Sequence, residues 1–317
     1  REMHLIQIKP EEALQPGKQD SLTFIYSGGF NEDISYLDAT REMIERQYRI
    51  WVYNVDKRSS IVTDDYLLLT RESLWYPQPG VTFSSDHPQR FNRFFMDVDL
   101  RVKTKSGLLA VAQGKREKTG EGEFRFRSEV PLPKISLAAG RYSEEQIRVD
   151  SVDYTINVLE GHDYYRSYFD AVGDTLAQVI RESKMDFENE LGLEYGYSRL
   201  SLVEVPVQFL AYSRLHTPAV ETVQPQMVLL PEKGIVLSDC DFARMSRWET
   251  RRRERSNQEM SDSEMQSRLF RRFVRGTLVS EEQGLRFGGE QEVTFTATYA
   301  IFPNYFIYLT QVESERW

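Results

Sequence analysis

The sequence predicts an α+β protein in which an antiparallel β-domain precedes a region that mixes helices with strands. Three observations lead to this prediction. Short apolar segments separated by Gly, Pro, Asp and Ser clusters run through the first half of the chain. The apolar spacing then changes to three or four residues near residue 160, and two arginine-rich helical segments follow within residues 240–276. We therefore expect two domains, a β-sandwich-like domain over residues 1–160 and an α/β domain over residues 161–317.

Eight segments of the first half have the length and composition of β-strands. Within residues 96–102 the apolar side chains occupy every second position, so one face of this strand meets a core and the other meets water. Short strands joined by turn-forming residues favour antiparallel sheets. The expected strands are Leu22–Tyr26, Arg49–Tyr53, Tyr66–Leu69, Phe95–Val102, Leu108–Ala112, Phe124–Glu129, Ile135–Ala139 and Val152–Val158.

A long amphipathic helix is predicted over residues 163–191. Its apolar residues recur at intervals of mostly three and four, and Gly192 follows as a C-terminal cap. The switch from strands to this helix is the reason for placing the domain boundary near residue 160. Strand-like segments follow at Leu200–Val205, Met227–Leu230, Glu292–Ala300 and Tyr305–Thr310.

The two arginine-rich helices are expected to pack through apolar stripes. The second begins with Ser261 and Glu264 at the spacing of a capping box, and Gly276 ends it. From Arg244 to Arg275 there are ten Arg and five acidic residues, a local net charge of +5. These arginines form either the solvated faces of two amphipathic helices or a surface that docks an acidic partner or lipid head groups.

Composition excludes several classes of protein. The 317 residues are 40% hydrophobic and rich in Tyr and Phe, which is typical of a folded chain. A net charge of −9 argues against nucleic acid as a partner, because the field of the molecule repels phosphate. Cys240 is the one cysteine, so an intrachain disulfide and a multi-cysteine metal site are excluded. No apolar run is long enough to span a bilayer, and a start at Arg1 suggests a piece of a longer protein.

The sequence contains none of the common local catalytic motifs. The four histidines do not form the H-E-x-x-H pair that places two imidazoles on one helical face around zinc. A G-x-S-x-G nucleophile turn, a phosphate-binding P-loop and a dinucleotide-binding glycine motif are also absent. We therefore predict no catalytic residue, no metal ligand and no cofactor within this chain.

Two segments are candidates for binding a peptide. Trp75 and Tyr76, followed by two prolines, form either an aromatic docking surface or a packed turn between strands. The segment from His216 to Glu221 lies in the connection between two expected strands, where ligand-contacting loops often occur, and it is otherwise a plain loop.

The order of several segments resembles the aminopeptidase N family of gluzincin metallopeptidases. Pro16–Gly28, the Trp75–Tyr76–Pro77 turn and Val130–Tyr142 are similar to the β-domain that begins such proteins. The long helix followed by Tyr195–Pro206 is similar to the entry into their catalytic domain. The resemblance covers roughly residues 14–232, and it implies that the second domain is like the start of a thermolysin-like catalytic domain.

The resemblance implies one binding residue, Glu221, and it shows that the histidines expected to bind zinc are missing from this chain. Where the family has a Gly-Ala-Met-Glu-Asn loop whose Glu holds the free amine of the substrate, this chain has Pro218–Thr222, so Glu221 takes that role. The helix that should carry the zinc ligands corresponds to Met265–Arg275, which offers arginines instead of histidines. A guanidinium stays protonated and has no lone pair for zinc.

Similar peptidase-like ectodomains are joined to bacterial permeases of the ABC transporter kind. The resemblance thus implies a non-catalytic module on the extracytoplasmic, periplasmic side, tethered to a membrane-embedded permease segment of the same protein or complex. It would bind a peptide or partner protein through Glu221, Trp75 and Tyr76. Two alternatives stay open: a zinc aminopeptidase fragment whose H-E-x-x-H motif lies outside this chain, and a structural spacer.

Overall fold

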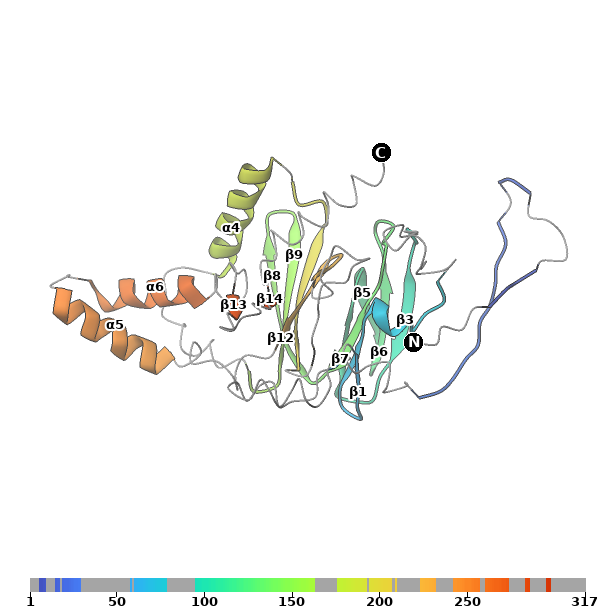
Figure 1. Cartoon of the computed structure of the whole chain (residues 1–317), viewed down its shortest axis with the longest axis horizontal. Helices are drawn as coiled ribbons and strands as arrows, with labels where there is room; N and C mark the ends of the chain where they lie inside the picture. Colours follow the sequence, from blue (N-terminus) through green and yellow to red (C-terminus); the bar gives the residue numbers. More distant parts are fainter. Residues whose placement is uncertain are drawn as a thin grey trace, which may run out of the picture.

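The structure is a computed structural model whose described residues form four β-sheets and a few helices (Figure 1). The expectation of a chain with both α and β structure is therefore confirmed. The structure describes residues 6–9, 15–17, 19–29, 58, 60–78, 95–162, 176–192, 194–206, 209, 223–231, 242–256, 260–273, 283–285 and 295–297.

The first two sheets are antiparallel and come from the first half of the chain. The four-stranded sheet has the order β1-β2-β7-β4, and the three-stranded sheet has the order β3-β6-β5. In the first sheet the strands are β1 (Ile61–Val62), β2 (Leu67–Leu69), β4 (Leu109–Ala112) and β7 (Leu137–Gly140). In the second they are β3 (Asp99–Lys103), β5 (Lys115–Gly120) and β6 (Glu123–Arg127). A short 3₁₀ helix, Arg71–Ser73, follows β2.

The third sheet is mixed and has five strands in the order β11-β12-β10-β9-β8. Its middle strand β10 runs parallel to both β9 and β12, whereas β8 and β11 pair antiparallel to their neighbours. The strands are β8 (Tyr142–Val149), β9 (Val152–Leu159), β10 (Arg199–Val205), β11 (Val223–Gln224) and β12 (Met227–Pro231). The small fourth sheet pairs β13 (Gln283–Leu285) with β14 (Phe295–Ala297).

Three α-helices belong to the described residues. Helix α4 (Leu176–Leu191) connects β9 to β10 and lies against β8 (Figure 1). Helices α5 (Phe242–Ser256) and α6 (Asp262–Phe273) form a hairpin that extends away from the sheets. The amide of Glu264 donates to the Ser261 hydroxyl and the Ser261 amide donates to the Glu264 carboxylate, so the predicted capping box is confirmed. Within the described residues, no helix has the length and apolarity to cross a membrane.

The four-stranded sheet is buried on both faces. On one face Leu137 and Ala139 of β7 pack with Phe124 and Phe126 of β6 in a cluster that also holds Ala110 and Ala112. On the other face Ala138 packs with the five-stranded sheet. Alternate residues of one strand therefore supply two cores, as the pleat requires.

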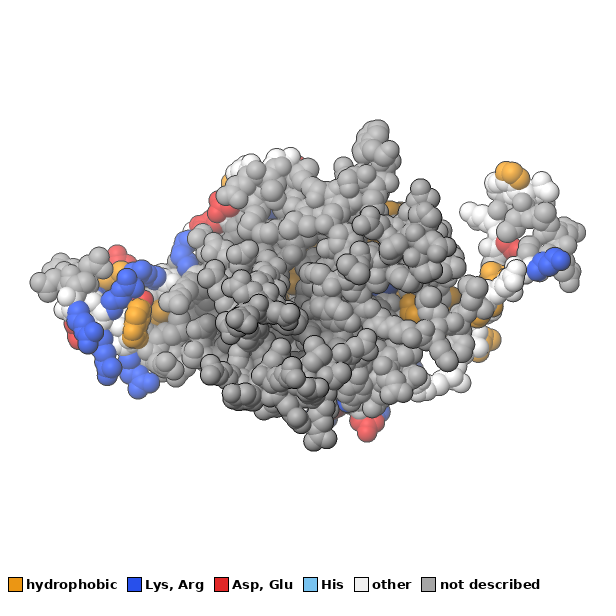
Figure 2. All heavy atoms as spheres, viewed as in Figure 1, with side chains coloured by type: hydrophobic (Ala, Val, Ile, Leu, Met, Phe, Trp, Pro, Cys, Tyr) orange, Lys and Arg blue, Asp and Glu red, His pale blue; other side chains and the backbone are white. Residues whose placement is uncertain are grey.

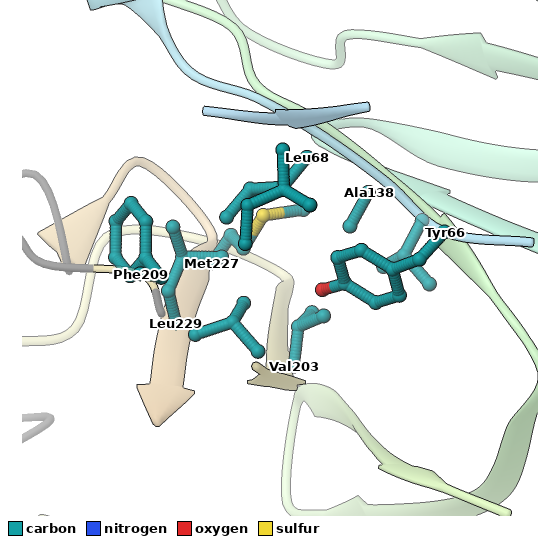
Figure 3. Packing of buried hydrophobic residues seen from close by; sticks show 10 residues of the cluster. Tyr66, Leu68, Ala138, Val203, Phe209, Met227 and Leu229 are labelled. Atoms are coloured by element: carbon teal, nitrogen blue, oxygen red, sulfur yellow. The ribbon is translucent and has the colours of Figure 1, made fainter. Parts of the chain in front are cut away.

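The second of these cores joins the four-stranded and five-stranded sheets (Figure 3). Tyr66, Leu68 and Ala138 come from the four-stranded sheet and its flank. Val203 and Met227 come from the five-stranded sheet. The full cluster of buried residues is Ile61, Tyr66, Leu68, Val111, Ala138, Val203, Val205, Phe209, Met227 and Leu229. This apolar contact holds the two halves of the chain together.

Gly140 ends β7 at a point where no side chain fits. A Cβ on Gly140 would lie 2.9 Å from Cδ2 of Tyr66 and 3.3 Å from Cε2 of Tyr142. The two tyrosine rings pack edge to face with centroids 6.2 Å apart. Since both rings are constrained by this packing, neither can move aside without loss of contact.

Most of the predicted strands and helices are confirmed. Strands occur within or close to eight of the segments predicted, from Tyr66–Leu69 to Met227–Leu230, and part of Glu292–Ala300 forms β14. Helix α4 confirms the last part of the long helix of residues 163–191, and α5 and α6 confirm both arginine-rich helices. Arg49–Tyr53, Tyr305–Thr310 and residues 163–175 lie outside the described residues.

The prediction of a strand at Leu22–Tyr26 is wrong, because this segment pairs with no strand of the described residues. It is apolar by composition but solvent-exposed, and Ile25 is 95% exposed. Strands β5 and β8 were not predicted, since their polar sequences lack an apolar alternation. The domain boundary near residue 160 stays a prediction, and the pairing of β9 with β10 crosses it.

We expect Gly140→Ala to lower the free energy of unfolding by about 1–3 kcal/mol, the usual cost of overpacking a core. The added methyl must displace the Tyr66 ring. Urea unfolding followed by circular dichroism measures this change. Gly29→Ala is the control, because nothing lies within 4 Å of its Cβ position and its φ is not positive. Equal stability of both variants would show that the tyrosines yield without cost.

Candidate functional site

The carboxyl ends of the parallel strands β9, β10 and β12 meet at one edge of the five-stranded sheet. In sheets with parallel strands this edge is where ligands commonly bind, because the connections that leave it spread apart. Here the edge carries Leu159, Glu204 and Pro231 at the strand ends, and His162 follows β9.

Glu204 is the central polar group of this edge. Its side chain is buried, and one carboxylate oxygen lies 2.9 Å from Nδ1 of His162. The other oxygen accepts a hydrogen bond of 2.7 Å from the main-chain amide of Leu159. Both oxygens therefore have partners, which is the condition for keeping a carboxylate in a protein interior.

Two tyrosines approach the same residue from its backbone side. The Tyr142 hydroxyl donates to the Glu204 carbonyl oxygen at 3.0 Å, and the Tyr66 and Tyr142 hydroxyl oxygens are 2.9 Å apart. Burial raises the pKa of Tyr142 well above its ordinary value; the Tyr66 hydrogen bond opposes this shift and the Glu204 charge adds to it. The hydroxyl of Tyr142 therefore stays protonated and serves as a hydrogen-bond donor.

The Glu204 cluster, which we define as Tyr66, Tyr142, His162 and Glu204, joins four strands or their flanks. These four residues offer one imidazole and one carboxylate, whereas a catalytic zinc site has three protein ligands. Among the residues that the structure describes, no group of three or more His, Cys, Asp or Glu side chains could hold a metal ion. The cluster positions the strand ends.

The predicted site residues fall in different parts of the described chain or outside it. Glu221 lies outside the described residues, in the sequence between β10 and β11. Trp75 is partly buried against the core of the three- and four-stranded sheets, and its ring packs edge to face with Tyr76 at a centroid distance of 5.1 Å. Their role in peptide binding stays a prediction.

The Trp75–Tyr76 turn has polar contacts on two sides. The Tyr26 hydroxyl donates to the main-chain carbonyl of Trp75 at 2.8 Å, and the Tyr76 hydroxyl accepts from the amide of Ile135 at 3.4 Å. These contacts are what a packed turn between strands requires, and they fix the direction of the aromatic pair.

The strand that follows Glu221 in the sequence is an edge strand. Sheet order places β11 outermost, beside β12, and within the described residues no strand pairs with its other side. An edge strand presents main-chain N–H and C=O groups to any extended chain that lies beside it. β11 is thus outermost in the order of the described strands, and its Gln224 is buried.

The sequence alone did not predict the Glu204 cluster. His162 was considered only as one of four histidines that could have bound zinc. One signal was available, because Glu204 interrupts the apolar run of an expected buried strand. A carboxylate at such a position needs a partner. The two tyrosines carried no local signal, since Tyr66 and Glu204 are 138 residues apart.

Comparison with known proteins gives distant likenesses only. No family model matches the chain, and no curated protein matches it significantly. An aminopeptidase N family protein from Idiomarina loihiensis aligns with 65% of this chain and 29% of its own, at 11% identity and a TM-score of 0.33. Legionella pneumophila aminopeptidase A in complex with aspartic acid aligns with 54% of this chain and 19% of its own, at 11% identity and a TM-score of 0.32.

The aligned region thus spans less than a third of either aminopeptidase.

We expect the stability of the protein to fall above about pH 10, where tyrosines of the unfolded chain ionise. Because the pKa of Tyr142 is raised in the folded state, its stabilising contribution is complete below that pH and is lost as the pH rises. Tyr142→Phe should make this fall shallower, by up to about 1.4 kcal/mol per pH unit. Urea unfolding between pH 8 and about pH 11.5 measures the slope.

Tyr26→Phe is the matched control, since Tyr26 is exposed. It should leave the alkaline slope as in the wild type. If Tyr142→Phe also left the slope unchanged, the hydroxyl of Tyr142 would not be held as described.

Proposed function

We propose that this chain is a non-catalytic, peptidase-like module that binds an extended peptide, or an extended segment of a partner protein, along the outer edge of β11. Glu221 binds the free amine of that peptide. The observation that carries the proposal is the edge position of β11, which begins two residues after Glu221 in the sequence.

An edge strand and a carboxylate together suit the amino end of a peptide. Main-chain hydrogen bonds to an added strand give affinity with little dependence on sequence. A carboxylate next to the edge strand adds a charge-assisted bond to an ammonium group, which also fixes the position of the peptide along the edge. Proteins with a free amino terminus are thereby preferred over internal segments.

The resemblance to the aminopeptidase N family agrees with this role for Glu221, since the corresponding Glu of that family holds the amine of the substrate. The sequence in place of the zinc helix supports a non-catalytic module. Helix α6 buries Met265, Leu269 and Phe270, and its Arg271 forms an ion pair of 2.8 Å with Glu182 of α4. These four side chains are occupied with packing and ion pairing.

The cellular setting follows from the same resemblance. In this proposal residues 1–160 form a β-sandwich-like domain and the following region is the start of a thermolysin-like domain. The module lies on the extracytoplasmic side and is tethered to a membrane-embedded permease segment of the same protein or complex.

Trp75 and Tyr76 contribute an aromatic contact to the bound peptide in this proposal.

We expect Glu221→Gln to weaken binding of short peptides about tenfold, since one charge-assisted hydrogen bond is lost. N-acetylation of the peptide should weaken binding to the wild type by a similar factor and have no further effect on the variant. Fluorescence anisotropy with a labelled library of free-amine peptides measures both. Glu160→Gln is the matched control, because Glu160 is an exposed carboxylate at the end of β9. Equal binding by both variants would remove Glu221 from the site.

A zinc site within this chain itself, built from residues outside an H-E-x-x-H motif, is tested by metal content. We expect the purified chain to hold no stoichiometric zinc by plasma mass spectrometry and to hydrolyse no aminoacyl fluorogenic substrate. Bound zinc with turnover that a chelator abolishes would overturn the non-catalytic proposal. A search for ligands would then begin with His87, His162 and His216.

A further inference from the structure

One face of α5 concentrates positive charge on the surface. Arg247, Trp248, Arg251, Arg252 and Arg255 recur at the three- and four-residue spacing that aligns side chains along a helix, and all five are exposed. We call these five residues the arginine face. Figure 2 shows the Lys and Arg side chains gathered over this end of the molecule.

The arginine face surrounds an exposed aromatic ring. Trp248 is 56% exposed, and the Arg252 guanidinium lies 5.5 Å from the centroid of its ring. Trp248, Arg251, Arg252 and Arg255 together line an open groove. The cation–π contact with Arg252 holds the ring in place, and the exposed part of the indole remains apolar surface that a partner can bury.

The other side of α5 is held by α6. The Thr250 hydroxyl lies 3.7 Å from the sulfur of buried Met265, and Arg253 lies 3.4 Å from the Asp262 carboxylate. Arg271 of α6 in turn pairs with Glu182 of α4. The hairpin is thus attached through its inner side, which leaves the arginine face directed outward.

Charge is separated between this hairpin and the rest of the chain. The segment from Arg244 to Arg275 carries +5 and the whole chain −9, so the remaining residues carry −14. The hairpin extends from the sheets (Figure 1), and α5, with its 15 residues, is about 22 Å long. Since charges are screened over about 8–10 Å in physiological salt, the arginine face can meet an anionic plane while the acidic body stays outside the range of repulsion.

We propose that the arginine face docks on the surface of a bilayer that contains anionic phospholipids. Guanidinium groups bind phosphate oxygens through two parallel hydrogen bonds, and the groove of Arg251, Arg252 and Arg255 supplies several of them. Trp248 occupies the boundary between head groups and acyl chains, where indole rings are favoured. An acidic protein segment would match the arginines but gives no role to the exposed indole ring. This inference does not rest on peptide binding.

Vesicle sedimentation of the whole chain tests the proposal. The wild type should bind phosphatidylcholine vesicles that contain 30% phosphatidylglycerol, and should bind pure phosphatidylcholine at least tenfold more weakly. Raising NaCl to 0.5 M should release it. The variant with Arg251→Gln and Arg255→Gln should lose at least tenfold in affinity, and Trp248→Ala should lose affinity with its salt dependence retained.

The matched control removes the same charge elsewhere. Arg101→Gln combined with Arg148→Gln changes two exposed arginines of the sheets and should bind vesicles like the wild type. Thermal unfolding of each variant checks that it is folded, and an Arg255→Glu variant tests the face by charge reversal if the double variant unfolds. Equal losses in both double variants, or equal binding to both kinds of vesicle, would overturn the proposal. So would binding of a labelled polyglutamate peptide without binding of either vesicle.

Discussion

The fold depends on one strand that is buried from both sides. β7 has the sequence Leu137-Ala-Ala-Gly140, and all four residues are buried between two other layers of sheet. Only small side chains let a strand lie close to packed neighbours on both faces, because each added methyl must displace a side chain already in contact. The three-stranded and five-stranded sheets are brought onto the same central sheet by this constraint.

The polar groups at the sheet junctions follow from this close approach. Where two sheets meet, main-chain groups that lack a ladder partner must bond to side chains. The side-chain oxygen Oε1 of Gln113 accepts from the main-chain amide of Ser136 at 2.8 Å, and Oε1 of Gln226 accepts from the main-chain amide of Gly114 at 2.9 Å. Tyr66 and Tyr142 do the same for the Glu204 carbonyl. The edge that carries Glu204 is thereby fixed in place by the same packing that forms the core.

Local periodicity predicted most of the apolar strands and the described helices, although the apolar segment Leu22–Tyr26 is not a strand. Val152–Val158 and Leu200–Val205 are buried strands whose composition alone indicates their state, and Ser261 with Glu264 marks a helix start that the structure confirms. It failed for β8, whose sequence from Tyr142 to Val149 is mostly polar and which is a strand because β9 pairs with it. The Glu204 cluster was beyond reach, since it depends on contacts between residues far apart in the chain.

The two proposed surfaces use opposite charges on different elements, and this separation has a physical reason. A carboxylate that binds an amine works best where few cations compete, and Glu221 belongs to the part of the chain whose net charge is −14. The arginine face needs an excess of arginine over acidic neighbours, because a neighbouring carboxylate pairs with a guanidinium group, as Glu249 does with Arg252 at 3.8 Å. Collecting the arginines on a hairpin that extends from the sheets satisfies both requirements in one chain. The hairpin can therefore lose its arginine face without disturbing the edge of β11, and each surface can be tested with the other intact.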